Sequence, residues 1–358
     1  MKKICILLNS LVDSNGVSRS AVAVANLLTS RNNVEITLVP IYKCSKETVT
    51  RLNNKIIVKN IFGFYFNGFS FLSNIIPLGF YIWLLSLKKY DILIAFQYGL
   101  STRIVGAIPN SSDSTRIAWM HGYDNGLRLR SDYEKIGHVV CVSKYNAAKL
   151  KKEIPDIEVD FNYNPIDDEQ VRMSGLEEIE LKRPSCPLFI SVGRHSKEKG
   201  FMRLLEIVSR LKTEGYMFNL WLVGDGPQHQ ELMSYSSNKG LNDIVIFLGA
   251  KGNPHAYTSK ADVFICSSYT EGYSTACTEA IMLGVPVITT NVSGGEEIIT
   301  DSGCGILTGI DDDSLYNGMK VVLDQPHIIN EWKNILNTTK NNFSQRNRSD
   351  HLFKILGI

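Results

Sequence analysis

Paired cysteines are missing from this chain of 358 residues. Its seven cysteines are odd in number and scattered, and none belongs to a C-x-x-C pair. Several of them stand in apolar runs that suit buried strands. This usage argues against a disulfide framework and against a zinc site, and it favours a reduced, cytoplasmic setting. Short-period repeats and low-complexity segments are absent as well.

The sequence also lacks an unbroken apolar run that would span a membrane. The nearest candidate is the segment 60–87, which contains no charged residue and is rich in aromatic side chains. Glycine, asparagine and proline interrupt it, and it leads directly into a predicted strand at 91–96. Two interpretations stay open: a helix and loop packed into the first domain, or an aromatic edge that dips into the membrane interface. The short apolar run at 4–8 predicts a first strand rather than a signal peptide.

Runs rich in valine, isoleucine and leucine alternate with helix-like segments along the chain. The first half predicts strands at 4–8, 34–40, 56–58, 91–96, 116–120 and 138–142. The pattern starts again with strands at 187–192, 218–223, 244–248, 263–266 and 285–289. Continuous apolar strands separated by helices are typical of parallel sheets covered on both faces. The sequence therefore predicts an α/β protein with two consecutive Rossmann-like domains.

The length of the chain also favours two domains, because a domain usually holds ~100–150 residues. We expect an N-terminal domain at 1–165, a polar, acidic linker at 166–185, a C-terminal domain at 186–335 and a helical tail at 336–358. Residues 1–165 contain 20 Lys and Arg against 12 Asp and Glu, whereas the remainder contains 18 against 24. The basic first half suggests an anionic partner, for which nucleic acid and an anionic membrane face are both candidates.

Two carboxylates, Glu271 and Glu279, stand eight residues apart just after a predicted strand. If a helix begins at Ser274, Glu271 lies in the loop at the strand's carboxyl end and Glu279 about one and a half turns into the helix. The free amides of the helix's first turn lie between them. Such a site offers two acceptors for sugar hydroxyls and a partly positive helix end for a phosphate. This combination suits a sugar nucleotide.

Two cations, Arg194 and Lys199, follow the predicted strand at 187–192. Both are expected at the carboxyl edge of the sheet, where ligands of open α/β sheets bind. Arginine grips phosphate oxygens through two parallel bonds, and lysine supplies a mobile point charge. The pair could therefore neutralise the charge that grows on a departing nucleoside diphosphate.

The E-x7-E segment, with the Ala-Ile-Met-Leu-Gly-Val-Pro-Val-Ile that continues it, resembles that of the retaining GT-B glycosyltransferases of family four (glycosyl transferases group 1), of the polysaccharide-biosynthesis type. The G-R-x4-K-G pattern at 193–200 is similar to the family's diphosphate-binding motif. The likeness is dense at 188–310 and thin in the first half. It implies a GT-B fold, in which two Rossmann-like domains face each other across a cleft and a C-terminal helix crosses back to the first domain.

The resemblance implies a role for each matching residue of the second domain. Glu279 would bind the ribose hydroxyls, Glu271 the hydroxyls of the donor sugar, and Arg194 and Lys199 the donor diphosphate. The amides between the carboxylates would hold hydroxyls and phosphate; they belong to Gly272, Tyr273, Ser274 and Thr275.

Four further positions match the family less densely. Gly224 lies in a Gly-Asp-Gly-Pro turn that would line the donor pocket, and Gly249 falls where the family holds the nucleotide base. Gly16 follows Asn15 where the family has a Gly-Gly pair near the donor phosphate. His121 ends a predicted strand, at a place where a histidine of the family reaches the donor sugar, and it joins Glu271, Arg194 and Lys199 in the implied catalytic set.

Neither a metal nor a cofactor is expected beyond the nucleotide sugar as co-substrate. Asp311 and Asp313 have the D-x-D spacing of metal-dependent glycosyltransferases of another fold. Their context, a glycine-rich loop followed by the start of a helix, predicts helix caps instead. A dinucleotide-binding fingerprint at Gly224 is broken, because His229 stands in place of its third glycine.

The resemblance implies a retaining glycosyltransferase that moves a hexose or N-acetylhexosamine from a nucleotide sugar to a saccharide acceptor. UDP is favoured because it is the family's commonest nucleotide. The basic, aromatic first domain favours a lipid-linked or cell-surface glycan precursor as acceptor, and a cytoplasmic protein peripheral to the inner face of the membrane. The alternatives are a soluble acceptor, or a nucleotide-sugar-binding or epimerase-type protein on the same fold. No nucleic-acid partner is expected.

Overall fold

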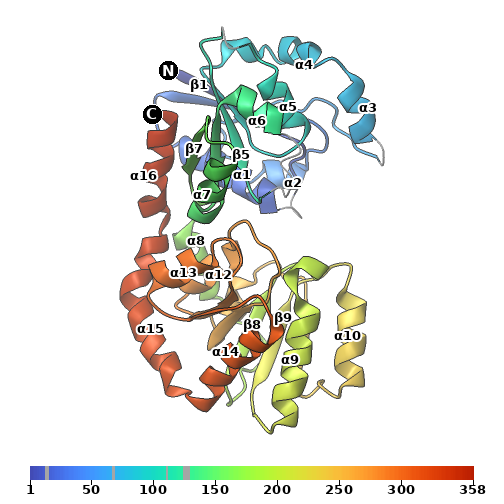
Figure 1. Cartoon of the computed structure of the whole chain (residues 1–358), viewed down its shortest axis with the longest axis vertical. Helices are drawn as coiled ribbons and strands as arrows, with labels where there is room; N and C mark the ends of the chain where they lie inside the picture. The colour runs from blue at the N-terminus through green and yellow to red at the C-terminus, as the bar shows by residue number, and fades with distance from the viewer. Residues whose placement is uncertain (13–15, 67–68, 110–111, 124–129) are drawn as a thin grey trace. The chain divides into compact units, whose positions relative to one another are not determined.

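The computed structural model of the chain (Figure 1) describes residues 1–12, 16–66, 69–109, 112–123 and 130–358. The chain divides into two compact units, Met1–Pro165 with Arg348–Ile358, and Ile166–Asn347. Each unit is built on one parallel sheet. The predicted α/β fold with two Rossmann-like domains is confirmed.

The first unit contains a seven-stranded sheet in the order β3-β2-β1-β4-β5-β6-β7. Its strands are β1 (Lys2–Leu8), β2 (Val34–Pro40), β3 (Ile57–Val58), β4 (Ile92–Ala95), β5 (Thr115–Met120), β6 (His138–Cys141) and β7 (Glu158–Phe161). The central strand β1 is buried from Ile4 to Leu8. A strand covered on both faces must be apolar on both, which explains why its sequence is a continuous run rather than an alternating one.

Helices flank this sheet in Figure 1: α1 (Gly16–Leu28), α2 (Lys46–Val49), α3 (Phe69–Ile75), α4 (Leu78–Leu84), α5 (Leu100–Gly106), α6 (Arg130–Ile136), α7 (Lys144–Glu153) and α16 (Gln345–Leu356). Cys5 and Leu7 of β1 belong to one core cluster with Tyr81 of α4 and Ile104 of α5. The aromatic segment therefore contributes an inner side to this core. Among the described residues, no helix is long and apolar enough to cross a membrane.

The second unit contains a six-stranded sheet in the order β10-β9-β8-β11-β12-β13. Its strands are β8 (Leu188–Val192), β9 (Asn219–Val223), β10 (Val245–Gly249), β11 (Val263–Cys266), β12 (Val287–Thr290) and β13 (Ile306–Thr308). Its helices are α8 (Asp168–Gly175), α9 (Phe201–Thr213), α10 (His229–Asn238), α11 (His255–Thr258), α12 (Thr275–Met282), α13 (Gly295–Ser302), α14 (Asp312–Asp324) and α15 (His327–Thr339).

Two strands and one helix depart from the sequence expectations. β7 carries two acids, Glu158 and Asp160, and β13 is only three residues long, so neither forms a conspicuous apolar run. Within the segment expected to be a linker, residues 168–175 form α8, which packs on α11 and α12. Gly175 allows this approach, because a Cβ there would overlap the side chain of Leu283.

The helical tail is interrupted at Ser344, and its last part, α16, packs on the first unit. Lys2 Nζ donates to the carbonyl of Gly357 at 2.7 Å. The guanidinium of Arg31 lies 4.0 Å from the ring centroid of Phe353. The first unit is therefore completed by residues from the far end of the chain.

Candidate functional site

The strand order of the second sheet reverses between β8 and β11, which are adjacent in the sheet although two strands, β9 and β10, lie between them along the chain. In open α/β sheets, ligands bind outside the carboxyl ends of the strands at such a switch point. Arg194 and Lys199 follow β8, and Glu271 follows β11. The fold thus brings the predicted cations and one predicted carboxylate to the same sheet edge.

Lys199 and Glu271 form an ion pair, with Nζ 2.6 Å from Oε1. Their side chains are 30% and 11% exposed. The hydroxyl of Ser268 donates to the same carboxylate oxygen at 2.6 Å. Burial acts to lower the pKa of Lys199, but the charge of Glu271 and the bond to it outweigh burial, so the pKa is raised and the ammonium stays charged. Glu271 is therefore held in one place by a cation and a hydroxyl.

The first turn of α12 lies directly after Glu271. Ser274 is its N-cap, and its hydroxyl oxygen accepts from the amide of Cys277 at 3.3 Å. Tyr273 is buried beside Gly294, where a Cβ would overlap its ring. The carbonyl of Gly272 accepts from the hydroxyl of Ser293 at 2.8 Å, and Thr275 is exposed. These contacts fix the loop and direct the amino end of α12 toward the sheet edge where an anion would bind.

Glu279 lies on the second turn of α12 and is partly buried. His255 of α11 stands beside it, with Nε2 3.4 Å from Oε2 of the carboxylate. Sequence reasoning missed His255, because a lone histidine at a short helix has no distinctive pattern. The pair leaves Glu279 anchored on one side by an imidazole.

Three loops at the ends of β8, β9 and β10 are tied together by backbone hydrogen bonds. Gly193 N donates to Val223 O at 3.0 Å, and Gly224 N donates to Gly249 O at 2.9 Å. Gly224 has φ +141°, and a Cβ there would overlap the carbonyl oxygen of Gly193. Glycine at 224 is thus required both by backbone conformation and by space. Gly249, at the end of β10, has φ +68°.

His195 is fully buried beneath these loops and contacts His229, with their Nδ1 atoms 2.8 Å apart. Burial, helped by the neighbouring His229, lowers the pKa of His195 to about 4. Its amide donates to Asp225 O at 2.9 Å, and its carbonyl accepts from Gln228 N at 2.9 Å. The His229 that breaks the glycine fingerprint therefore has a structural contact of its own. Arg194, the residue before His195, is exposed. The pKa of Glu198 is lowered, chiefly by a hydrogen bond from Ser196 and to a smaller extent by the charge of Arg194.

Arg203 is a further residue that the sequence did not reveal. It is 1% exposed, and its guanidinium donates to three carbonyl groups: Ser267, Ser268 and Ile310. Ser267 and Ser268 form the start of the loop that carries Glu271, so Arg203 fixes the base of that loop. The available signal was an arginine on the apolar side of α9, beside buried Leu204 and Ile207.

The two remaining predicted residues, Gly16 and His121, belong to the first unit. His121 Nε2 lies 3.0 Å from the carbonyl oxygen of Phe96, which can only accept, so Nε2 carries the hydrogen and Nδ1 the lone pair of the neutral ring. Burial lowers the pKa of His121 to about 4. Gly16 begins α1 and is exposed, with open space where a Cβ would be. Asn15, which precedes Gly16 in the pair that replaces the family's Gly-Gly, lies outside the described residues.

A polar pair missed by the sequence analysis stands at the switch point of the first sheet, between β1 and β4. Asn9 follows β1, and Gln97 follows β4. The backbone amide of Asn9 donates to the side-chain oxygen Oε1 of Gln97 at 2.9 Å. These are polar groups in the same topological position as Lys199 and Glu271 in the second unit.

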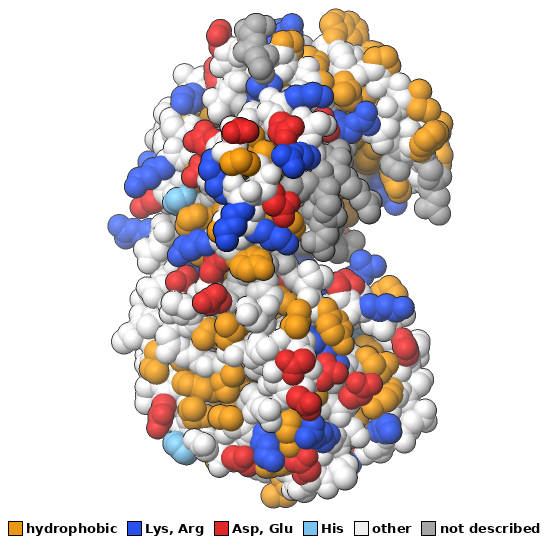
Figure 2. Space-filling view, viewed as in Figure 1, with side chains coloured by type: hydrophobic (Ala, Val, Ile, Leu, Met, Phe, Trp, Pro, Cys, Tyr) orange, Lys and Arg blue, Asp and Glu red, His pale blue; other side chains and the backbone are white. Residues whose placement is uncertain are grey.

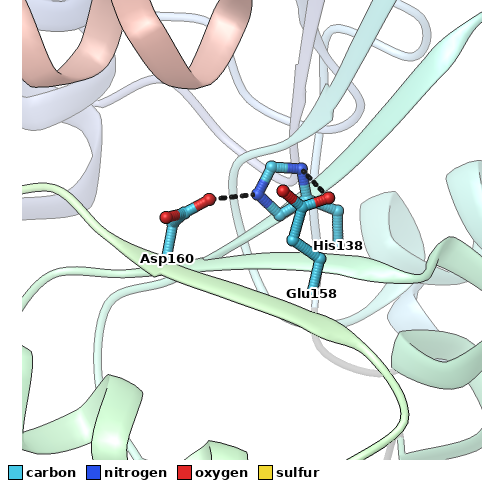
Figure 3. Close-up of side chains that lie close together, drawn as sticks. All are labelled: His138, Glu158 and Asp160. Carbon is cyan, nitrogen blue, oxygen red and sulfur yellow. Dashed lines mark hydrogen bonds and ion pairs between the residues drawn. The ribbon is translucent and has the colours of Figure 1, made fainter.

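Two groups bear on metal binding. Asp311 caps α14, as expected, because its carboxylate accepts from the amide of Ser314 at 2.8 Å. In the first unit, His138 lies between Asp160 and Glu158 (Figure 3), with Nε2 3.0 Å from Asp160 Oδ2 and Nδ1 3.8 Å from Glu158 Oε2. The carboxylates meet different nitrogens of one ring, whereas a metal needs ligands that converge on one point. That the protein needs no metal stays a prediction.

Comparison with known families places the match in the second unit. Residues 176–341 match the model of the family described as Glycosyl transferases group 1. An N-acetylgalactosamine-N,N'-diacetylbacillosaminyl-diphospho-undecaprenol 4-alpha-N-acetylgalactosaminyltransferase of Campylobacter jejuni is 28% identical over 73% of this chain and 71% of its own length. The lipopolysaccharide core biosynthesis glycosyltransferase LpsD of Rhizobium meliloti is 27% identical over 62% of each chain.

Solved structures share the fold. Anabaena HepE in complex with UDP matches all of both chains with a TM-score of 0.80 at 15% identity. A glycosyltransferase from Rickettsia africae matches 99% of this chain and 98% of its own, with a TM-score of 0.75 at 19% identity. At such identities the likeness concerns the arrangement of the backbone, and it agrees with the two Rossmann-like sheets described above.

Proposed function

We propose that this chain, whose residues 176–341 match the family described as Glycosyl transferases group 1, is a retaining glycosyltransferase of glycan biosynthesis. In this proposal it transfers a hexose or N-acetylhexosamine from a UDP-sugar to a saccharide carried on a lipid. The observation that carries the proposal is the meeting of Lys199, Glu271 and the amino end of α12 at the switch point of the second sheet.

The donor would lie along this edge with its diphosphate at the cations. Arg194 and Lys199 supply the positive charge, and the amino end of α12 adds the partial charge of its dipole. Glu279, one turn further along the helix, would accept from the ribose hydroxyls. Glu271, held by Lys199 and Ser268, would accept from the hydroxyls of the donor sugar. The nucleotide base would rest on the backbone near Gly224 and Gly249.

The transfer step would depend on charge stabilisation. As the bond between the sugar and the diphosphate breaks, negative charge grows on the leaving oxygen, and Arg194 and Lys199 neutralise it. The leaving oxygen takes the proton of the acceptor hydroxyl, which attacks the same face of the sugar, so the anomeric configuration is retained. Glu271 is poorly suited as a nucleophile, because its Oε1 is already bonded to both an ammonium and a hydroxyl.

The acceptor is proposed from the relatives and from the first unit. The Campylobacter relative is named for a diphospho-undecaprenol acceptor and the Rhizobium relative for the lipopolysaccharide core. His121 is neutral at physiological pH, with its lone pair on Nδ1. It would therefore accept a hydrogen bond from a hydroxyl of the donor sugar rather than act as a cation. We also infer a cytoplasmic protein that works at the inner face of the membrane.

A donor-binding screen tests the first half of this proposal. Thermal unfolding would be followed with UDP-, GDP-, ADP- and dTDP-sugars in the presence of EDTA, on the wild type and Glu279→Ala. We expect UDP-sugars to raise the melting temperature, and the shift to shrink in Glu279→Ala. Glu206→Ala, which removes an exposed glutamate of α9, is the matched control and should behave as the wild type. If a UDP-sugar raised the melting temperature only when EDTA was left out, that result would contradict a metal-free site.

The product tests the second half. The anomeric configuration of the transferred sugar, read by NMR with a lipid-linked acceptor extract, should equal that of the donor. An inverted product would rule out the retaining mechanism. Conversion of the UDP-sugar to an epimer or a sugar phosphate without any acceptor would instead support the epimerase-type alternative.

A further inference from the structure

The two short helices α3 and α4 of the first unit carry apolar side chains on their outer sides. Phe71 and Trp83 are 71% and 73% exposed. Other large exposed apolar residues of the same segment surround them: Phe64, Tyr65, Phe66, Leu72, Ile75, Phe80 and Leu84. Figure 2 shows hydrophobic side chains gathered at the upper right, where Figure 1 places α3 and α4. We call this set the α3–α4 surface.

Much of this exposure belongs to residues on helices whose inner sides are packed. In α4, Tyr81 is fully buried, whereas Phe80, Trp83 and Leu84 point outward at the spacing of one helix face. The hydroxyl of Tyr81 donates to Ser73 O of α3 at 2.9 Å, and Ser73 is itself bonded to Tyr42 at 2.7 Å. The inner sides are therefore anchored by hydrogen bonds, and the outer sides are presented in a fixed arrangement.

The outer side of an ordinary surface helix is polar. Here the whole segment 60–87 contains no charged residue, and a patch formed by so many aromatic side chains marks an interaction site. Each helix has only seven residues, far short of the ~20 residues that cross a bilayer. Such helices can lie in the interface between headgroups and acyl chains, where aromatic side chains are favoured.

Basic residues next to the surface indicate the kind of interface. Lys88 and Lys89 follow α4 in a short turn and are exposed. Arg103 donates to Asn74 of α3 at 2.5 Å, which places its cationic end at the same helix. A basic residue close to an anionic bilayer is attracted to its headgroups. A protein partner would have to match a surface that offers few directional groups, whereas a bilayer needs none.

We propose that the α3–α4 surface inserts into the headgroup region of an anionic bilayer and holds the enzyme where its acceptor resides. The purpose of this membrane contact rests on the proposed function, because it would bring the enzyme to a lipid-linked acceptor. The surface itself belongs to the first unit and shares no residue with the proposed donor site. Phe71 and Trp83, with their neighbours, would enter the interface, and Lys88, Lys89 and Arg103 would contact the anionic headgroups.

The four tryptophans of the chain provide a direct probe. Trp119, Trp221 and Trp332 are 2%, 0% and 7% exposed, whereas Trp83 is 73% exposed. A change of surroundings from water to lipid would therefore alter mainly the emission of Trp83. The full chain would be mixed with vesicles of phosphatidylglycerol and phosphatidylethanolamine, or of phosphatidylcholine alone. We expect flotation with the anionic vesicles, a blue shift of tryptophan emission, and quenching by brominated acyl chains. Trp83→Phe should still float but lose the spectral change.

A double variant tests the insertion itself. Phe71→Ser with Trp83→Ser should reduce the vesicle-bound fraction at least tenfold, since two large apolar side chains would leave the interface. Met217→Ser, which changes an 81% exposed methionine of the second unit, should float as the wild type. Phe71 and Trp83 are both exposed, so the melting temperature of the double variant should hardly differ from that of the wild type.

The outcomes separate this proposal from the proposed function. A wild type that stays in solution at low salt, or a double variant that still floats, would overturn insertion. If the wild type instead forms dimers without lipid and the double variant is monomeric by light scattering, the surface joins two copies of the chain, and the bilayer is the wrong occupant. Stabilisation by UDP-sugar, measured on the same double variant, tests the donor site independently.

Discussion

Lys199 and Glu271 illustrate how single residues depend on each other in this protein. The resemblance assigns the lysine to the diphosphate and the glutamate to the sugar, yet in the structure they form one ion pair of 2.6 Å with little exposure. Each therefore supports the other before any donor binds. A partly buried charge that loses its partner is costly, so either substitution affects both the local structure and the chemistry.

Replacing Lys199 by methionine should lower kcat about a hundredfold or more, because a donor aimed at growing negative charge is typically worth ~10²–10³ in rate. Methionine keeps the apolar stem, so the change chiefly removes the charge. Lys197→Met, which alters an exposed lysine of the same short helix, is the control and should keep its rate. Steady-state kinetics with the UDP-sugar found in the screen would decide, and equal losses in both variants would refute a specific role for Lys199.

His195 makes stability depend on pH. Its pKa in the folded protein, about 4, lies below the usual 6.5 of an unfolded histidine. Between these values the unfolded chain binds a proton that the folded chain does not, so the free energy of unfolding falls as pH falls through this window. From pH 7 to 4.5 we expect a loss of about 2 kcal/mol from this residue.

Urea unfolding of the wild type and of His195→Gln at both pH values measures this effect. The variant should be less stable at pH 7 but should lose less on acidification. His327→Gln, a change at an exposed histidine of α15, should keep the wild-type dependence. Parallel pH profiles for the wild type and His195→Gln would assign the acid sensitivity to other groups, such as His121.

At the scale of elements, the ends of β8, β9 and β10 work as one unit. Their loops exchange backbone hydrogen bonds through Gly193, Gly224 and Gly249, and His195 packs beneath them. The sequence showed these glycines as separate turn signals. Their joint role arises because parallel strands end at the same edge of the sheet.

Gly224→Ala should destabilise the second unit by several kcal/mol, since the methyl group would overlap Gly193 O and the backbone has φ +141°. Gly16→Ala provides the contrast, because a methyl group there meets open space. We expect the melting temperature of Gly16→Ala to equal or exceed that of the wild type. Unchanged stability in Gly224→Ala would contradict the close loop packing.

At the scale of the molecule, the first unit is discontinuous in sequence. The chain leaves it at Pro165 and returns at Arg348. Leu352, Phe353 and Leu356 of α16 are buried, and Lys2 bonds the carbonyl of Gly357. The C-terminal helix is thus part of the first unit's core.

Removal of residues 348–358 should destabilise the first unit by several kcal/mol, because each buried leucine or phenylalanine contributes about 1.5–3 kcal/mol. The second unit keeps all of its own strands, so stabilisation by UDP-sugar should persist in calorimetry as a separate transition. A milder variant, Leu352→Ala, should lower the same transition of the first unit without altering the other. A truncated chain that melts like the wild type would show that α16 is dispensable.

Local pattern was sufficient for much of this protein. Apolar runs and helix starts depend on neighbouring residues, so the sequence by itself determined two Rossmann-like domains, the strand at 263–266 and the capping role of Asp311. It failed at β7, whose Glu158 and Asp160 disguise a strand, and at β13, which is too short to show a period. The site residues were found through motifs, and their roles stay predictions.

Contacts between distant segments were decided by the tertiary structure alone. Lys199 and Glu271 are 72 positions apart, and Arg203 reaches the carbonyl groups of Ser267 and Ser268 across a similar interval. The strand order that places β8 beside β11 is a property of the whole sheet, which no local pattern encodes. Likewise, the segment 60–87 could be either core or surface by composition. Only packing revealed that Tyr81 faces the core and Trp83 the solvent, because that choice depends on what each helix lies against.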